Sequence, residues 1–127
     1  MNVTLNRAEI LSVVKKAGTI ASQLSPLAEL RSILLEADST AGTLCLTATN
    51  LEISLEQRLA CKPKDDDIVA INARMLEAML TMLSGESVTL SRNTGVPEVI
   101  ITDGRTTYVV PVFEQGSFPK MEIPFPE

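Results

Sequence analysis

The residues of this chain that could do chemistry are few, and their spacing argues against a catalytic centre. Enzymes need a nucleophile with a base, a metal cluster or a phosphate-binding loop. The sequence has no histidine and no glycine-rich loop that could hold a phosphate group. Its one carboxylate cluster, Asp65-Asp66-Asp67, lies between expected strands, where such a charge run is typical of a solvated turn. We therefore expect no catalytic residue, no enzymatic activity and no cofactor.

The two cysteines, Cys45 and Cys61, are too far apart in sequence to form a CxxC pair. Without that spacing and without histidine, the chain offers poor material for a zinc site. We expect no metal site and two reduced thiols, with Cys45 as a small residue within a strand.

Composition places the chain among ordinary globular domains. Hydrophobic residues make up 45% of its 127 residues and charged residues 21%, which suits one domain with a single core. No apolar stretch approaches the roughly 20 residues needed to span a bilayer, and no signal peptide begins the chain. These features predict a cytoplasmic protein that does not enter a membrane. The net charge of −5 argues against a protein that grips nucleic acid over its whole surface, but it allows basic residues gathered on one face.

A short pattern occurs twice in the chain. Residues 3–6 read Val-Thr-Leu-Asn and residues 69–72 read Val-Ala-Ile-Asn, each an alternating strand that ends on a favoured helix N-cap. Apolar residues follow at i, i+3, i+4 and i+7 in both copies: Ile10, Val13, Val14 and Ala17, then Leu76, Met79, Leu80 and Leu83. Both segments are therefore predicted to be helices that bury one stripe.

Three strands are expected after each helix, separated by turn-forming residues. They lie at 31–37, 43–48 and 51–59 in the first half, and at 87–91, 98–102 and 105–112 in the second. In the strand at 51–59, Leu51, Ile53, Leu55 and Leu59 alternate with polar residues and are expected on one face.

The order strand, helix, three strands, repeated once, predicts an α+β protein with two helices on one face of an antiparallel sheet. We expect residues 1–127 to form a single domain with internal halves at about 1–62 and 63–116. Two equivalent helices side by side would present a smooth surface, which suits a protein that lines something.

Four segments taken together resemble the N-terminal domain of bacterial sliding clamps, the DNA polymerase III beta subunit. They are 42–53 with its Thr-Asn-Leu-Glu turn, 69–74 at the entry to the second helix, 103–110 in the last strand, and 117–121 with its Phe-Pro pair. The resemblance implies the DNA-clamp fold, with an exit linker at 117–127. It also implies a segment of a closed head-to-tail ring, whose helices line a channel around duplex DNA and which gives the replicative polymerase its processivity without catalysis.

The resemblance also implies roles for particular residues. Arg74 matches a DNA-contacting arginine of the family. Lys15 and Lys16 lie off the apolar stripe of the first helix, so they are candidates for the same non-specific contact with double-stranded DNA, and ordinary solvated lysines are the alternative. Leu24 stands where the family has a second DNA-contacting arginine, so the loop at 23–30 departs from the pattern.

Met75, Arg105, Tyr108 and Val110 match the family's contact between protomers, where the last strand and the start of the second helix meet a neighbouring subunit. Tyr108 and Val110 alternate onto one face, so the alternative is that both belong to the core. Polymerase and clamp-loader docking lie in later domains of the family. Since one domain cannot close a ring by itself, we expect residues 1–127 alone to bind duplex DNA weakly or not at all. A stand-alone clamp-like interaction module without DNA binding is the alternative function, and the end of the chain at 124–127 leaves open whether it is cut or naturally short.

Overall fold

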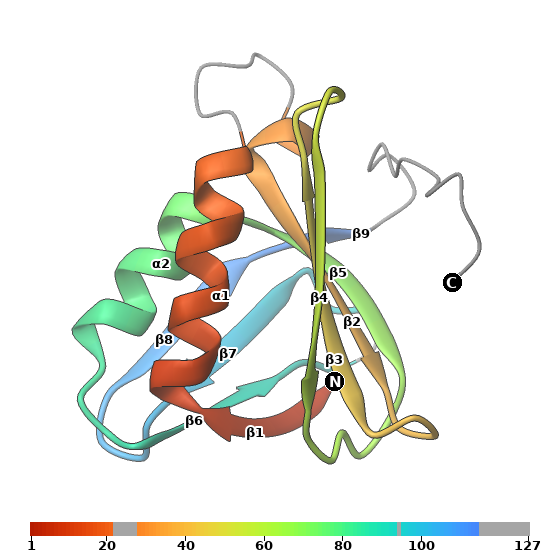
Figure 1. The fold of residues 1–127 in the computed structure, drawn as a ribbon. Helices are drawn as coiled ribbons and strands as arrows, with labels where there is room; N and C mark the ends of the chain where they lie inside the picture. The colour runs from red at the N-terminus through yellow and green to blue at the C-terminus, as the bar shows by residue number, and fades with distance from the viewer. Residues whose placement is uncertain (22–27, 94, 115–127) are drawn as a thin grey trace.

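The computed structural model describes residues 1–21, 28–93 and 95–114 (Figure 1). Its elements are, in order, β1 (Asn2–Asn6), α1 (Arg7–Ile20), the 3-10 helix η1 (Ala28–Arg31), β2 (Ser32–Asp38), β3 (Thr43–Thr49), β4 (Ser54–Ala60), β5 (Asp67–Asn72), α2 (Ala73–Met82), β6 (Ser87–Ser91), β7 (Glu98–Thr102), β8 (Thr107–Pro111) and β9 (Phe113–Glu114). Leu24 and the expected linker at 117–127 lie outside the described residues.

The duplication predicted from the sequence is present in the structure. Strand, helix and three strands occur as β1-α1-β2-β3-β4 and again as β5-α2-β6-β7-β8. The side chain of Asn6 accepts a hydrogen bond from the backbone N–H of Glu9 at 2.9 Å, and that of Asn72 accepts one from Met75 at 3.0 Å. Both asparagines therefore cap their helices, as their position before the apolar stripes predicts.

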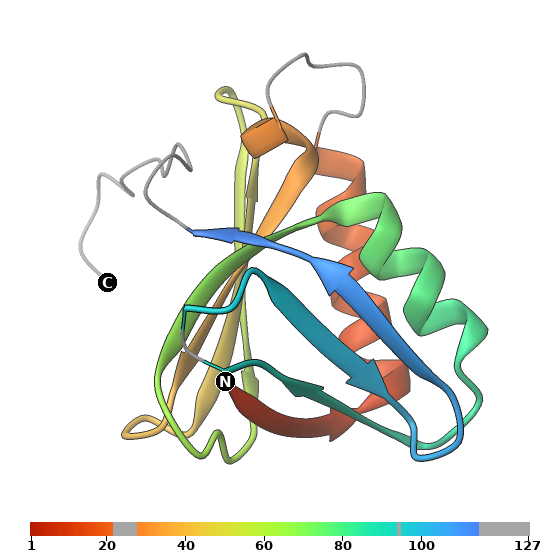
Figure 2. The same ribbon diagram turned by 180° about the vertical axis from the view of Figure 1, so that it is seen from behind.

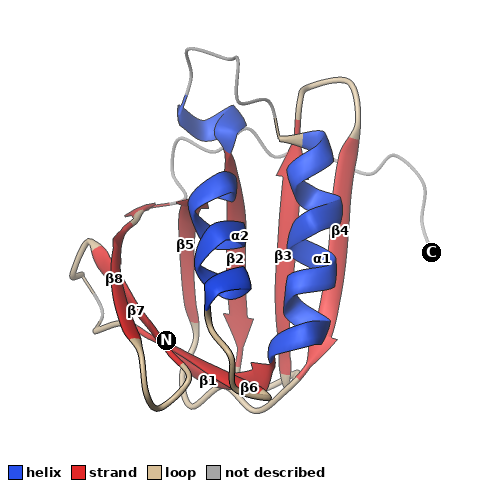
Figure 3. Ribbon diagram, turned by 90° about the vertical axis from the view of Figure 1, so that its left-hand side faces the viewer, coloured by secondary structure: helices blue, strands red, loops and turns tan. Residues whose placement is uncertain are grey.

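Both helices bury the stripes that their spacing predicts. Ile10, Val13, Val14 and Ala17 of α1 are at most 2% exposed, and the α2 stripe from Leu76 to Leu83 is at most 8% exposed. Figure 3 shows α1 and α2 side by side on one side of the strands. The opposite side of each helix is left for solvent, so the two helices share one outward surface.

The strands form two antiparallel sheets within the described residues, where the sequence analysis expected one. The orders are β1-β6-β7-β8 and β4-β3-β2-β5-β9. The first strand of each half pairs with the other half: Val3 of β1 lies opposite Leu90 of β6, and Ile71 of β5 lies opposite Ile33 of β2. Because of this exchange, neither half can complete its sheet alone, and the two halves form one folded unit (Figures 1 and 2).

The core fills the space between the helix pair and the inner faces of the sheets. Large aliphatic side chains from both sheets are fully buried there, among them Ile33, Leu35, Leu44, Leu46, Ile71, Leu90 and Ile101. In β1, polar residues alternate with buried ones: Thr4 lies outside, between the buried Val3 and Leu5. Burial of this aliphatic surface supplies the main stabilisation of the fold.

Arg7 and Asp103 hold the end of α2 against the rest of the molecule. The Arg7 guanidinium donates to the carbonyl oxygens of Gly85 at 2.7 Å and Leu80 at 3.0 Å, so a cation lies at the C-terminal end of α2. The Asp103 carboxylate accepts backbone hydrogen bonds from both the α2–β6 loop and its own turn, at Ser84, Gly85, Arg105 and Thr106. These bonds to the ionised carboxylate hold the pKa of Asp103 well below its usual range.

The predicted strand at 51–59 is wrong at its start. β4 begins at Ser54, and Leu51 and Ile53 are 54% and 56% exposed, while Leu55 and Leu59 do pack inward. The reason is a turn held by side chains: Asn50 Oδ1 accepts from the N–H groups of both Glu52 and Ile53, at 2.9 and 2.8 Å. This local hydrogen bonding competes with the strand ladder and turns two apolar residues out into solvent.

Candidate nucleic-acid interface and ring contact

The outward surface of the helix pair carries the three basic residues expected to contact DNA. Lys15 and Lys16 are exposed on α1, and Arg74 is exposed in the first turn of α2. They come from both halves of the duplication, on two helices that pack against each other. All three lie outside the buried stripes of their helices, so their role in DNA contact stays a prediction.

Arg74 borders a shallow depression of about 420 Å³ on the outer side of α2. Glu77, Ala78, Thr81 and Met82 complete its lining. The depression is open and lacks a buried polar group, so it has none of the convergent polar groups that fix a small molecule. A long, flexible arginine at its rim suits contact with a mobile, negatively charged surface instead.

Carboxylates interrupt the basic surface. Glu9 lies in the first turn of α1, where a negative charge favours the helix dipole. Glu77 lies one turn beyond Arg74 and leans toward α1: its Oε1 atom is 3.3 Å from where a Cβ on Gly18 would be. The outward surface is therefore mixed in charge, with a carboxylate at the seam between the two helices.

The residues expected at the contact between protomers divide into outward and inward positions. Met75 is 41% exposed, and Arg105 is exposed in the β7–β8 turn. Tyr108 is half-buried, and its hydroxyl donates to the sulfur of Met82 at 3.8 Å. Val110 is only 1% exposed and belongs to the core, which is the alternative that the alternation of β8 had left open.

Two further apolar residues of this region are exposed and were not predicted from the sequence. Met82 at the end of α2 is 62% exposed, and Val109 of β8 is 56% exposed. Val109 lies on the outer side of β8 because Val110 points into the core. Since β8 is the last strand of its sheet, one of its backbone edges has no partner strand in the described residues. The sequence did not show which face of β8 points into the core, and that orientation determines the outer position of Val109.

The acidic run at residues 65–67 binds other parts of the chain. Asp66 accepts from both the backbone N–H and the hydroxyl of Ser39, which lowers its pKa. The prediction of a solvated turn is wrong for Asp67, whose side chain is 7% exposed and pairs with Arg92. That hydrogen-bonded pair is the main reason the pKa of Asp67 falls to about 2.

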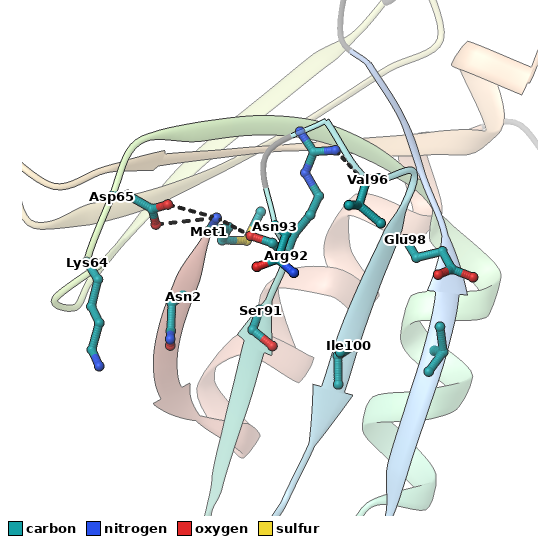
Figure 4. A pocket seen from close by; sticks show the side chains of 11 residues that line it. Met1, Asn2, Lys64, Asp65, Ser91, Arg92, Asn93, Val96, Glu98 and Ile100 are labelled. Carbon is teal, nitrogen blue, oxygen red and sulfur yellow. Dashed lines mark hydrogen bonds and ion pairs between the residues drawn. The ribbon is translucent and has the colours of Figure 1, made fainter.

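A groove of about 500 Å³ lies on the outer side of the β1-β6-β7-β8 sheet, remote from the helix surface (Figure 4). Val96, Ile100 and Val109 form its apolar part, and Lys64, Asp65 and Glu98 are among its polar residues. Figure 4 shows the amino group of Met1 beside Asp65 at one end. The groove presents charges of both signs without a cluster of either.

Both cysteines are free thiols, one buried and one half-buried. Burial raises the pKa of Cys45 and of Cys61, so neither is activated as a thiolate. Across the described ranges, no group of three histidine, cysteine or acidic residues could hold a metal ion. The helices in the same ranges include none that is long and apolar enough to cross a bilayer.

Comparison with known proteins agrees with this arrangement. The family described as DNA polymerase III beta subunit, N-terminal domain, matches residues 1–122. The beta sliding clamp of Caulobacter vibrioides is 26% identical over 122 residues, which are 95% of this chain and 32% of that protein.

Solved structures share the same fold. A DNA polymerase sliding clamp from Caulobacter crescentus has a TM-score of 0.89 at 24% identity, over 98% of this chain and 33% of that one. The Helicobacter pylori beta clamp bound to a DNA ligase peptide has a TM-score of 0.87 at 14% identity, over 97% of this chain and 34% of that one. This chain thus spans about a third of the length of the relatives it matches.

The duplicated strand–helix–three-strand unit, with exchanged first strands and a paired-helix surface, is therefore a clamp-type α+β fold. Since the family match runs over nearly the whole chain, the chain belongs to the DNA polymerase III beta subunit N-terminal domain family.

Proposed function

We propose that this chain is a non-catalytic segment of a ring-shaped sliding clamp, which encircles duplex DNA and gives a replicative polymerase its processivity. The observation that carries the proposal is the helix-pair surface, where Lys15, Lys16 and Arg74 are exposed on the side opposite the core. Family membership supports a role in replication, and the cytoplasm is the compartment we propose.

A clamp needs weak, sequence-independent attraction to DNA. Three exposed cations offer few phosphate contacts, and phosphate contacts carry no sequence information. The net charge of −5 opposes strong binding of DNA over the whole surface, so a few local contacts would supply the attraction. For residues 1–127 alone we expect a dissociation constant within or above the non-specific range, roughly 10⁻⁶ to 10⁻⁴ M.

We propose further that Met75, Arg105 and Tyr108 contact a neighbouring clamp unit, with Val110 supporting Tyr108 from the core. The exposed edge of β8 and the apolar exposure of Met75 and Met82 support this assignment. Polymerase and clamp-loader contacts are assigned to the part of the relatives' length that this chain does not cover. Residues 1–127 then act as one clamp domain, built from halves at about 1–62 and 63–116 and followed by a linker at 117–127.

The experiment that tests DNA contact is a nuclear magnetic resonance titration of the chain with a short duplex at low salt. Chemical-shift changes are expected in α1 and α2. They should weaken in the triple variant Lys15→Ala, Lys16→Ala, Arg74→Ala. The matched control replaces Arg58, Lys62 and Lys64 with alanine, which removes the same charge from exposed positions in β4 and the segment after it. Equal weakening by both triple variants, or submicromolar salt-sensitive binding by the chain alone, would contradict the proposal.

A further inference from the structure

Glu77 stands out on the helix-pair surface because it places a negative charge where the proposed function calls for positive charge. It lies three residues after Arg74 on α2 and shares the same shallow depression. Within the part of the chain that the structure describes, Glu77 forms no ion pair. Its carboxylate therefore contributes its charge to this surface without neutralisation by a bonded cation.

The neighbouring helix makes room for this carboxylate. Gly18 lies inside α1, where glycine is less favourable than alanine by roughly 0.8–1 kcal/mol. A methyl group at Gly18 would lie 3.3 Å from the Glu77 Oε1 atom, which is closer than ordinary van der Waals contact. The missing side chain on α1 and the carboxylate on α2 thus fit together at the seam between the helices.

This position lies among the candidate DNA contacts. Lys15 is one turn before Gly18 on α1, and Arg74 is one turn before Glu77 on α2. A carboxylate at the seam repels a phosphate backbone that approaches either cation, and the repulsion is largest at low salt, where screening is weak.

We infer that the Glu77 carboxylate weakens the attraction between the helix surface and DNA. By lowering the affinity for duplex DNA, it allows a ring segment to move along the duplex instead of holding one position. This inference rests on the proposed function. Glu9 is less suited to the role, because it lies in the first turn of α1 beside the Asn6 cap and interacts with the helix dipole.

The test measures duplex binding by fluorescence anisotropy over a series of salt concentrations. Glu77→Gln keeps the shape and removes the charge, and we expect it to tighten binding by about twofold to fivefold at low salt. Glu77→Lys adds a cation; it should tighten binding by about tenfold and steepen the logarithmic salt dependence by about 0.9. A purely structural role for Glu77 would not produce tighter binding.

The matched control is Glu98→Gln, which removes the same charge from the exposed outer side of the β1-β6-β7-β8 sheet. It should leave affinity unchanged. If Glu77→Gln binds no tighter than the parent chain, or if Glu98→Gln tightens binding equally, the inferred role of Glu77 is refuted. The triple variant Lys15→Ala, Lys16→Ala, Arg74→Ala distinguishes failure of this inference from failure of the proposed function. If it binds DNA as tightly as the parent chain, the proposed DNA surface is wrong.

Discussion

Arg92 and Asp67 form a bidentate ion pair that joins the two sheets. Arg92 Nε donates to Asp67 Oδ2 at 2.8 Å, and Nη2 donates to Oδ1 at 2.9 Å. Arg92 follows β6 in one sheet and Asp67 begins β5 in the other. Both side chains are at most 7% exposed, and the amino group of Met1 also contacts Asp67 at 3.2 Å. The pair therefore joins the two sheets at a buried point, and the Met1 amino group adds a contact from the first half of the duplication.

Replacing Arg92 with methionine should destabilise the protein strongly. The change keeps much of the side-chain volume but leaves the Asp67 carboxylate buried without its main partner, which costs about 3 kcal/mol of unfolding free energy. Urea denaturation at neutral pH measures this loss. The double variant Arg92→Met, Asp67→Leu should recover part of it, because the buried carboxylate is then also gone and the Met1 amino group keeps its ion pair with Asp65. No recovery would mean that the charge itself is unimportant.

The same pair predicts a difference in acid stability. The pKa of Asp67 is held at about 2 in the folded protein, below its ordinary value of 3.8. A lowered folded-state pKa stabilises the protein above the unfolded pKa, and this contribution is lost as pH falls through the folded value. The shift corresponds to about 2 kcal/mol. The stability advantage of the parent over Arg92→Met should therefore narrow between pH 4 and pH 2, as measured by denaturation at a series of pH values. A constant difference over that range would contradict this assignment.

Replacing Leu51 with glycine should stabilise the protein. Leu51 has a φ of 77°, in the left-handed region that disfavours residues with a Cβ, and its side chain is largely in solvent. Glycine relieves that strain at the expense of a more flexible unfolded chain, for an expected net gain of about 0.5–1 kcal/mol. Thermal denaturation is the measurement. Glu52→Gly, at the exposed neighbouring position with ordinary φ, should lower stability instead; a loss in both variants would show that the Leu51 backbone is unstrained.

Gly18 and Glu77 should be coupled energetically. Alanine at Gly18 gains helix propensity but crowds the Glu77 carboxylate. In a Glu77→Ala background the crowding is gone, and Gly18→Ala should stabilise by about 0.8 kcal/mol. In the parent chain the gain should be smaller. A double-mutant cycle measured by urea denaturation isolates the difference, and additivity within about 0.3 kcal/mol would mean that the two residues do not interact.

The sequence by itself determined the elements and much of the proposed DNA surface. Helix spacing and capping depend on near neighbours, so the α1 and α2 stripes and the Asn6 and Asn72 caps could be predicted. The same periodicity placed Lys15 and Lys16 on the solvent side. Family resemblance, more than any local pattern, singled out Arg74.

Only the tertiary structure decided how the two halves combine. Strand pairing joins residues far apart in sequence, so the exchange of β1 and β5 between sheets leaves no local signal. It also decided which side of β8 faces the core, so that Val110 is buried and Val109 exposed, because alternation gives two faces without saying which is inside. The burial of Asp67 was likewise decided by the tertiary structure. An acidic run in the sequence indicates a solvated turn, but the fold brings the distant Arg92 against Asp67 and buries both side chains.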